Sequence, residues 1–149
     1  MKATLPNLGE RYTVELWFWN GLPADVRAVT GFIASRGAGD HLLVGGSGGR
    51  AGRLVVEVVT GSDHVGQTAV GLKAWHHVAL VRDTGSVAVY LYGKPEIPAA
   101  RAPFTPGNEL SFGGRGDGVA GWEGKLDEVA VYDRPLTADE IARHFAAVR

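Results

Sequence analysis

Three aspartates occupy places where a carboxylate could bind a metal ion. Asp127 lies in an apolar run, and strict alternation along a strand from 125 to 133 places it on the same face as Val129. Asp40 and Asp117 lie in two glycine-rich segments. Because Ca²⁺ prefers hard oxygen donors, Asp127 is a candidate calcium ligand. The alternative is a structural role, in which each carboxylate accepts backbone hydrogen bonds, pairs with an arginine or forms a turn.

Tryptophans supply a second kind of binding chemistry, because the flat apolar face of an indole suits the C–H face of a sugar ring. Trp17 and Trp19 share one face of an expected strand, and Phe18 lies on the other face. Trp122 lies in an expected loop. Trp19 and Trp122 are therefore candidate ligand contacts, and burial of these indoles in the core is the alternative.

Arg115 begins the tripeptide Arg-Gly-Asp, which integrins recognise, in a glycine-rich segment. We take Arg115 as a third candidate ligand contact. A three-residue match is a weak signal, and the alternative is a chance tripeptide in a turn.

Short apolar runs bounded by turn residues must position these side chains. Glycine makes up 22 of 149 residues, about twice its usual share, which disfavours long helices. The runs are rich in β-branched and aromatic residues, a pattern typical of a β sandwich or barrel. We expect strands at 12–19, 32–35, 41–44, 54–60, 75–82, 87–92, 110–113 and 125–132. Residues 83–86 predict a hairpin, and the prolines at 95, 98, 103 and 106 are expected to keep their connection out of the sheet.

One helix is expected at the C-terminal end. Thr137 and Glu140 have the spacing of a capping box, in which each side chain accepts a hydrogen bond from the backbone N–H of the other residue. Ile141, Phe145 and Val148 follow on one helix face and are expected to dock on the sandwich.

Three segments carry a resemblance to a known family. They are Tyr-Thr-Val-Glu-Leu-Trp-Phe at 12–18, Trp-His-His-Val-Ala-Leu-Val-Arg at 75–82 continuing to Tyr-Leu-Tyr-Gly-Lys-Pro at 90–95, and Gly-Lys-Leu-Asp-Glu-Val-Ala-Val-Tyr-Asp-Arg-Pro-Leu at 124–136. In this order they resemble the laminin G-like branch of the concanavalin A-like lectin/glucanase superfamily. The resemblance implies one all-β domain over residues 1–149, a jelly-roll sandwich of two antiparallel sheets with a short C-terminal helix. Calcium-binding members hold the ion between rim loops, which implies that Asp40, together with Asn108 or Asp117, is a candidate calcium ligand at the rim.

The same sandwich hosts glycan binders, protein binders and hydrolases, so the residues must decide the function. Retaining glucanases of the superfamily carry Glu-x-Asp-x-x-Glu on one strand, and this pattern is absent. Asp127 and Glu128 are adjacent and are expected on opposite faces. We therefore expect no enzyme but an accessory module that binds carbohydrate or protein. A purely structural domain and a glycoside hydrolase-like enzyme are the alternatives.

Composition and charge limit the classes of partner that the chain can bind. A formal net charge of −1 supplies no basic surface for nucleic acid, and no stretch approaches the ~20 apolar residues that span a bilayer. The absence of cysteine excludes thiolate chemistry. The chain opens without a signal-peptide pattern. The resemblance implies an extracellular, periplasmic or surface module with neighbouring domains in a longer parent chain.

Overall fold

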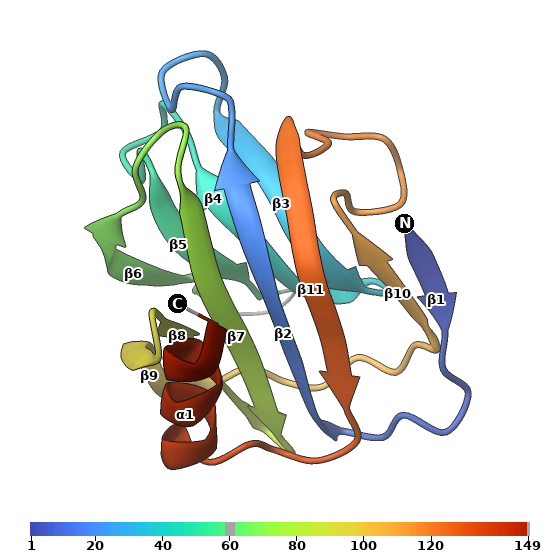
Figure 1. Ribbon diagram of the computed structural model, residues 1–149. Helices are drawn as coiled ribbons and strands as arrows, with labels where there is room; N and C mark the ends of the chain where they lie inside the picture. Colours follow the sequence, from blue (N-terminus) through green and yellow to red (C-terminus); the bar gives the residue numbers. More distant parts are fainter. Residues whose placement is uncertain (59–61, 149) are drawn as a thin grey trace.

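The computed structural model describes residues 1–58 and 62–148 and consists of two packed antiparallel sheets (Figure 1). The elements are β1 (Lys2–Thr4), β2 (Arg11–Asn20), β3 (Val29–Arg36), β4 (Gly39–Gly45), β5 (Arg53–Glu57), β6 (His64–Ala69), β7 (Trp75–Asp83), β8 (Ser86–Leu91), β9 (Lys94–Arg101), β10 (Glu109–Phe112), β11 (Gly124–Tyr132) and α1 (Ala138–Val148). One sheet has the order β1-β10-β3-β4-β5-β6 and the other β11-β2-β7-β8-β9. The predicted all-β sandwich with a C-terminal helix is confirmed.

Alternation along β2 decides which side chains enter the core. Val14, Leu16 and Phe18 are buried between the sheets, and Leu16 and Phe18 are 0% exposed. Trp17 and Trp19 point the opposite way and are half-buried. The outer face of the five-stranded sheet therefore carries indoles, as the sequence predicted.

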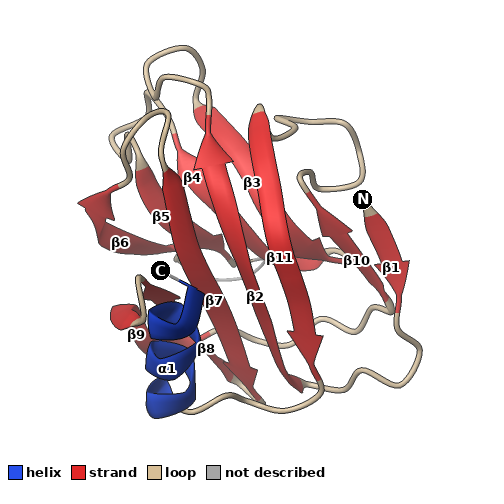
Figure 2. Cartoon of the chain, in the orientation of Figure 1, coloured by secondary structure: helices blue, strands red, loops and turns tan. Residues whose placement is uncertain are grey.

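Helix α1 lies against the outer face of the five-stranded sheet beside β7 (Figure 2). The capping box forms: the Glu140 N–H donates to Thr137 Oγ1 at 3.2 Å, and the Thr137 N–H donates to Glu140 Oε2 at 2.8 Å. Ile141 is fully buried against Ala79. Val148 is 54% exposed and lines depressions together with Trp17, so the last turn of the predicted apolar stripe lies at the sheet without being buried by it.

Three strands were not predicted from the sequence. β9 contains Pro95 and Pro98, which were expected to lie outside the sheet. It is an edge strand, where an imino acid without an N–H costs few ladder hydrogen bonds. β1 and β6 are the edges of the other sheet and lack a long apolar run. In the expected strand 54–60, residues 59 and 60 lie outside the described residues, and β5 ends at Glu57.

The second glycine-rich segment forms the connection between β10 and β11 and folds over the outer face of the six-stranded sheet. Phe32, Leu43 and Val55 form a small buried cluster on that face, and Ala120 of the connection packs against it. Gly31 lets the connection approach closely, because a Cβ there would lie 2.7 Å from Cε3 of Trp122.

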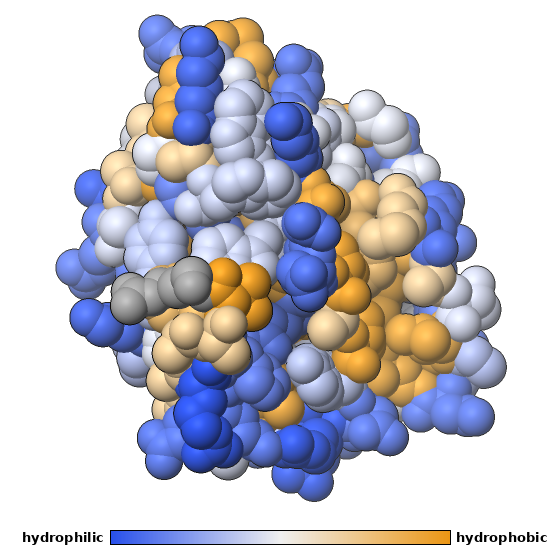
Figure 3. Space-filling model, in the orientation of Figure 1, coloured by the Kyte–Doolittle hydropathy of each residue, from blue (hydrophilic) through white to orange (hydrophobic). Residues whose placement is uncertain are grey.

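The sandwich is incompletely closed where the edge strand β11 faces β1 and β10. Leu126, Val129 and Val131 point toward the core but are only half-buried. Hydrophobic side chains gather on this side of the molecule (orange, Figure 3). Within the described part of the chain, no helix has the length and apolar character needed to cross a membrane.

Candidate functional site

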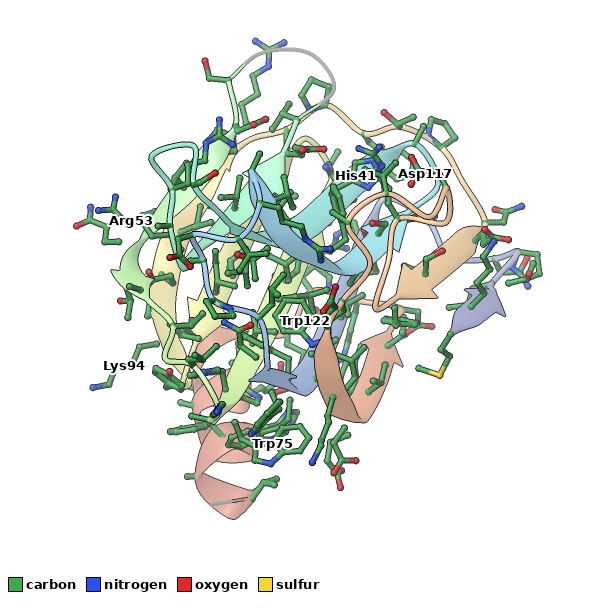
Figure 4. The ribbon with its side chains drawn as sticks, turned by 90° about the horizontal axis from the view of Figure 1, so that it is seen from above. His41, Arg53, Trp75, Lys94, Asp117 and Trp122 are labelled. Atoms are coloured by element: carbon green, nitrogen blue, oxygen red, sulfur yellow. The ribbon has the colours of Figure 1, made fainter. Side chains whose placement is uncertain are left out.

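Three tryptophans form one patch on the outer face of the five-stranded sheet. Trp19 of β2 stands directly opposite Trp75 of β7, and Trp17 stands opposite His77 one pair further along the same face. Directly paired residues in a sheet have side chains on the same side, close enough to touch. Trp75 is 43% exposed, and it points away from the sandwich on the same side as α1 (Figure 4). We call Trp17, Trp19 and Trp75 the indole platform.

Neighbouring side chains fix two of these indoles and leave the third open. The ring of Trp17 stacks on Phe145 of α1, with ring centroids 5.8 Å apart and planes at 26°. The Lys125 ammonium lies 5.2 Å from the ring centroid of Trp19, a cation–π contact. Trp75 forms no ring contact with another described residue, so its face is the most accessible part of the platform.

A β-bulge in β11 places two carboxylates beside the platform. Asp127 pairs with Trp17, the register then shifts, and pairing resumes at Ala130. Glu128 has a φ of 51°, a left-handed conformation that bends the strand. Both carboxylate residues are exposed, and together with Trp17, Trp75 and Val148 they line a depression of about 370 Å³.

The bulge overturns two predictions that assumed strict alternation. Asp127 was expected on the apolar face of Val129, but Asp127 is exposed, whereas Val129 packs against the core. Asp127 and Glu128 were expected on opposite faces, but both line the same depression. The extra residue in the bulge reverses which side chains face the core after it. The residue types in this segment do not indicate that a bulge is present.

A second depression, of about 230 Å³, lies next to the first and beneath α1. On its floor the buried Glu15 carboxylate accepts hydrogen bonds from His77 Nε2 at 2.8 Å and His144 Nδ1 at 2.9 Å. Burial raises the pKa of the Glu15 carboxyl, but these hydrogen bonds outweigh that effect and hold the pKa below its ordinary value. The cluster ties α1 to the sheet that carries the platform.

The other predicted site residues lie away from the platform. Arg115 and Asp117 line a depression on the six-stranded sheet with His41, and Figure 4 shows His41 and Asp117 on the far side of the molecule from Trp75. Arg115 donates to Asp117 Oδ2 at 2.7 Å. Its guanidinium also lies 4.9 Å from the ring centroid of Phe32. The arginine and aspartate of the Arg-Gly-Asp tripeptide therefore pair with each other.

Trp122 packs at the edge of the core. Its ring meets Phe18 edge-on at 5.5 Å between centroids, and its buried Nε1 has no hydrogen-bond partner in the part of the chain that the structure describes. The structure does not bring it together with Trp19, the other indole predicted to contact a ligand. Trp75, which was not predicted to contact a ligand, stands beside Trp19 through the pairing of β2 with β7, and neither segment alone shows this pairing.

Each of the three aspartates predicted to bind calcium already accepts hydrogen bonds from the protein. The Asp40 side chain is 6% exposed, and its carboxylate accepts hydrogen bonds from Tyr12 Oη at 2.6 Å and from Arg82 Nε at 2.6 Å. Asp117 accepts from Arg115 and from the Val119 N–H. Asp127 accepts from the Glu128 N–H. Within residues 1–58 and 62–148, no cluster of three or more acidic or histidine side chains has an arrangement that could hold a metal ion, and calcium binding by these aspartates stays a prediction.

A family model described as the concanavalin A-like lectin/glucanases superfamily matches residues 2–142. The chain belongs to this superfamily. Both the fold class and the laminin G-like resemblance predicted from the sequence are thereby confirmed. Among curated proteins, none matches the chain.

Solved structures of this superfamily's fold are similar to the chain at low sequence identity. Domain 4 of AbnA, an extracellular GH43 arabinanase from Geobacillus stearothermophilus solved with arabinotriose, has 21% identity and a TM-score of 0.67, over 90% of this chain and 66% of that one. A SAP-like pentraxin from Limulus polyphemus has 22% identity and a TM-score of 0.66, over 93% and 70%. A botulinum neurotoxin serotype D binding domain has 11% identity and a TM-score of 0.70, over 98% and 40%. The chain spans about two thirds or less of the arabinanase and toxin structures, and these likenesses show the sandwich fold.

Proposed function

We propose that this chain is a non-catalytic carbohydrate-binding module whose binding surface is the indole platform. The observation that carries the proposal is the cross-strand pair of Trp19 and Trp75 on a sheet face that α1 leaves partly uncovered. An exposed indole keeps a large apolar face in water, and a sugar ring stacked on that face would remove it from water.

Polar groups surround the platform at the places where sugar hydroxyls would lie. Lys125 offers hydrogen-bond donors next to Trp19, and Asp127 and Glu128 offer acceptors next to Trp75. A depression lined by aromatic side chains with a few polar groups beside them is the arrangement expected of a small-ligand site. The rim groups would orient the sugar while the indoles supply contact area.

The absence of Glu-x-Asp-x-x-Glu from the sequence supports a binding role without hydrolysis. The module would act as an accessory part of a longer extracellular or surface protein. Support comes from the similar AbnA structure, which is one domain of an extracellular enzyme and was solved with an oligosaccharide. Such a module would hold its parent protein on a polysaccharide.

The test is binding of the whole chain to a panel of soluble polysaccharides and oligosaccharides by affinity electrophoresis and calorimetry. We expect at least one glycan to bind, and Trp75→Ala to weaken that binding by about tenfold or more because the stacking face is removed. Trp75→Phe should retain most of the affinity. Val119→Ala, which truncates a 52% exposed side chain on the connection over the other sheet, is the matched control.

Two results would overturn the proposal. The first is unchanged glycan affinity in Trp75→Ala. The second is failure of every glycan to bind, which favours a purely structural domain. Release of reducing ends from a bound glycan would instead show that the module is a hydrolase.

A further inference from the structure

The depression beside the platform contains negative charge that the protein leaves unbalanced. Asp127 and Glu128 are both exposed, and neither forms an ion pair with any described residue. Among the described residues, the Asp127 carboxylate accepts a hydrogen bond only from the Glu128 N–H, at 2.9 Å. Asp83, an exposed carboxylate elsewhere on the same sheet, is balanced by an ion pair with Arg11 at 2.9 Å.

The aromatic part of the depression adds to this attraction for a cation. The face of an indole carries a negative quadrupole, so the rings of Trp17 and Trp75 favour positive charge as the carboxylates do. The platform already shows such a contact, because the Lys125 ammonium lies 5.2 Å from the ring centroid of Trp19. The side of the depression lined by Trp75 has no protein cation of this kind among the described residues.

We infer that this depression binds a cationic amine of the sugar, so that the preferred ligand is a glycan with free amino groups. The inference rests on the proposed function and names its ligand class. The ammonium group would lie between the Trp75 ring and the two carboxylates, and a neighbouring sugar ring would stack on the indoles.

The charged depression lies directly beside the pair of Trp19 and Trp75, and this arrangement favours an amino sugar over a basic peptide as the ligand. Trp75 belongs to both the depression and the pair with Trp19, so a charged group and an apolar ring face can be bound side by side. A polymer of amino sugars presents these two features on each residue. A methylated lysine side chain would fill the depression alone and would make no use of the neighbouring Trp19 ring, which contacts Lys125.

Three tetrasaccharides with the same β-1,4-linked glucose backbone test the inference. They are the tetramers of glucosamine, of N-acetylglucosamine and of glucose, which carry an ammonium, an acetamide and a hydroxyl at the same position. Calorimetry in a mildly acidic buffer of low ionic strength keeps the amine protonated. We expect the glucosamine tetramer to bind about tenfold more tightly than the other two, with the difference shrinking at high salt.

Variants separate the charge from the stacking surface. Glu128→Gln and Asp127→Asn should each reduce the preference for glucosamine several-fold while leaving the affinity for the glucose tetramer unchanged. Glu10→Gln removes an exposed carboxylate at the other end of β2 and should change neither affinity.

The outcomes of this experiment are distinguishable. Equal binding of the three tetramers, or a preference that survives Glu128→Gln and Asp127→Asn together, overturns the inference and leaves the proposed function intact. Failure of all three, and of the wider glycan panel, overturns the proposed function. Tighter binding of a trimethyl-lysine peptide than of any sugar overturns the inference in favour of a protein ligand.

Discussion

Trp19 and Trp75 stand directly opposite each other on β2 and β7, on the sheet face that α1 only partly covers. Trp122, by contrast, packs edge-on against Phe18 at the margin of the core. The chain therefore uses the same residue type for two purposes. The Trp75 indole faces solvent, whereas the Trp122 indole packs at the margin of the core.

This difference predicts opposite effects of two similar substitutions. Trp75→Ala should weaken glycan binding with a change in unfolding free energy within about 1 kcal/mol, because the side chain is 43% exposed. Trp122→Ala should lower the unfolding free energy by about 3 kcal/mol, since it opens a cavity beside Phe18. Urea unfolding and calorimetry on the same samples measure both quantities. Equal effects of the two variants on stability would contradict the assignment.

The buried ion pair of Arg82 and Asp40 should contribute strongly to the free energy of unfolding. Arg82 is 0% exposed, and it donates through Nε to Asp40, which also accepts from Tyr12. Burial, together with the Asp40 charge, raises the pKa of the Tyr12 hydroxyl well above its ordinary value. Asp40→Asn should cost about 3 kcal/mol of unfolding free energy, because it leaves the Arg82 guanidinium buried without its counter-charge.

The neighbouring exposed pair of Arg11 and Asp83 supplies the matched control. Asp83→Asn should cost less than about 1 kcal/mol, since surface pairs are screened by water. A cost for Asp40→Asn no larger than that for Asp83→Asn would show that Asp40 does not hold Arg82 in solution.

The Glu15 cluster predicts a pH dependence of stability. The folded-state pKa of Glu15 lies below its ordinary value of 4.5, because hydrogen bonds from His77 and His144 outweigh the effect of burial. Its contribution to stability is therefore full above about pH 4.5 and is lost as the pH falls further through the lowered pKa. Unfolding by urea from pH 7 down to pH 3 should show a smaller loss for Glu15→Gln than for the natural chain. Glu10→Gln should keep the slope of the natural chain, and a parallel slope for Glu15→Gln would contradict the assignment.

Calcium binding predicted for Asp127, Asp40 and Asp117 can be tested by a thermal melt with excess calcium and with chelator. Because these carboxylates already accept hydrogen bonds from Glu128, Arg82 and Arg115, we expect the same midpoint in both conditions. A higher midpoint in calcium that disappears in Asp117→Asn would establish a rim site that these contacts do not reveal.

Much of the fold could be predicted from the sequence because its strands repeat a simple alternation. The run from Tyr12 to Trp19 placed Trp17 and Trp19 on the outer face, and the spacing of Thr137 and Glu140 placed the start of α1. Both patterns are local in the sequence, so they can be recognised without knowing which strands pair with each other. The edge strand β9 was missed because its prolines are common signs of a break, although an edge tolerates them.

The candidate site could be predicted only in part, because it depends on relations between strands. Trp75 joins Trp19 through the register of β2 with β7, which no single segment states. Asp127 and Glu128 reach the same depression through a bulge, and a bulge breaks the alternation on which the face assignment relied. Asp40 could be recognised as a carboxylate in a turn, but its arginine partner lies 42 positions away.

Glu128 occupies a left-handed backbone position that glycine adopts without penalty. For a residue with a side chain this conformation costs roughly 1–2 kcal/mol, so glycine would make the bulge more stable. Stability and the proposed recognition of an amine therefore favour different residues at this one position. In an evolutionary comparison, descendants that have lost amine recognition would be free to drift to glycine or asparagine here, and those that retain it would keep a carboxylate in spite of the strain.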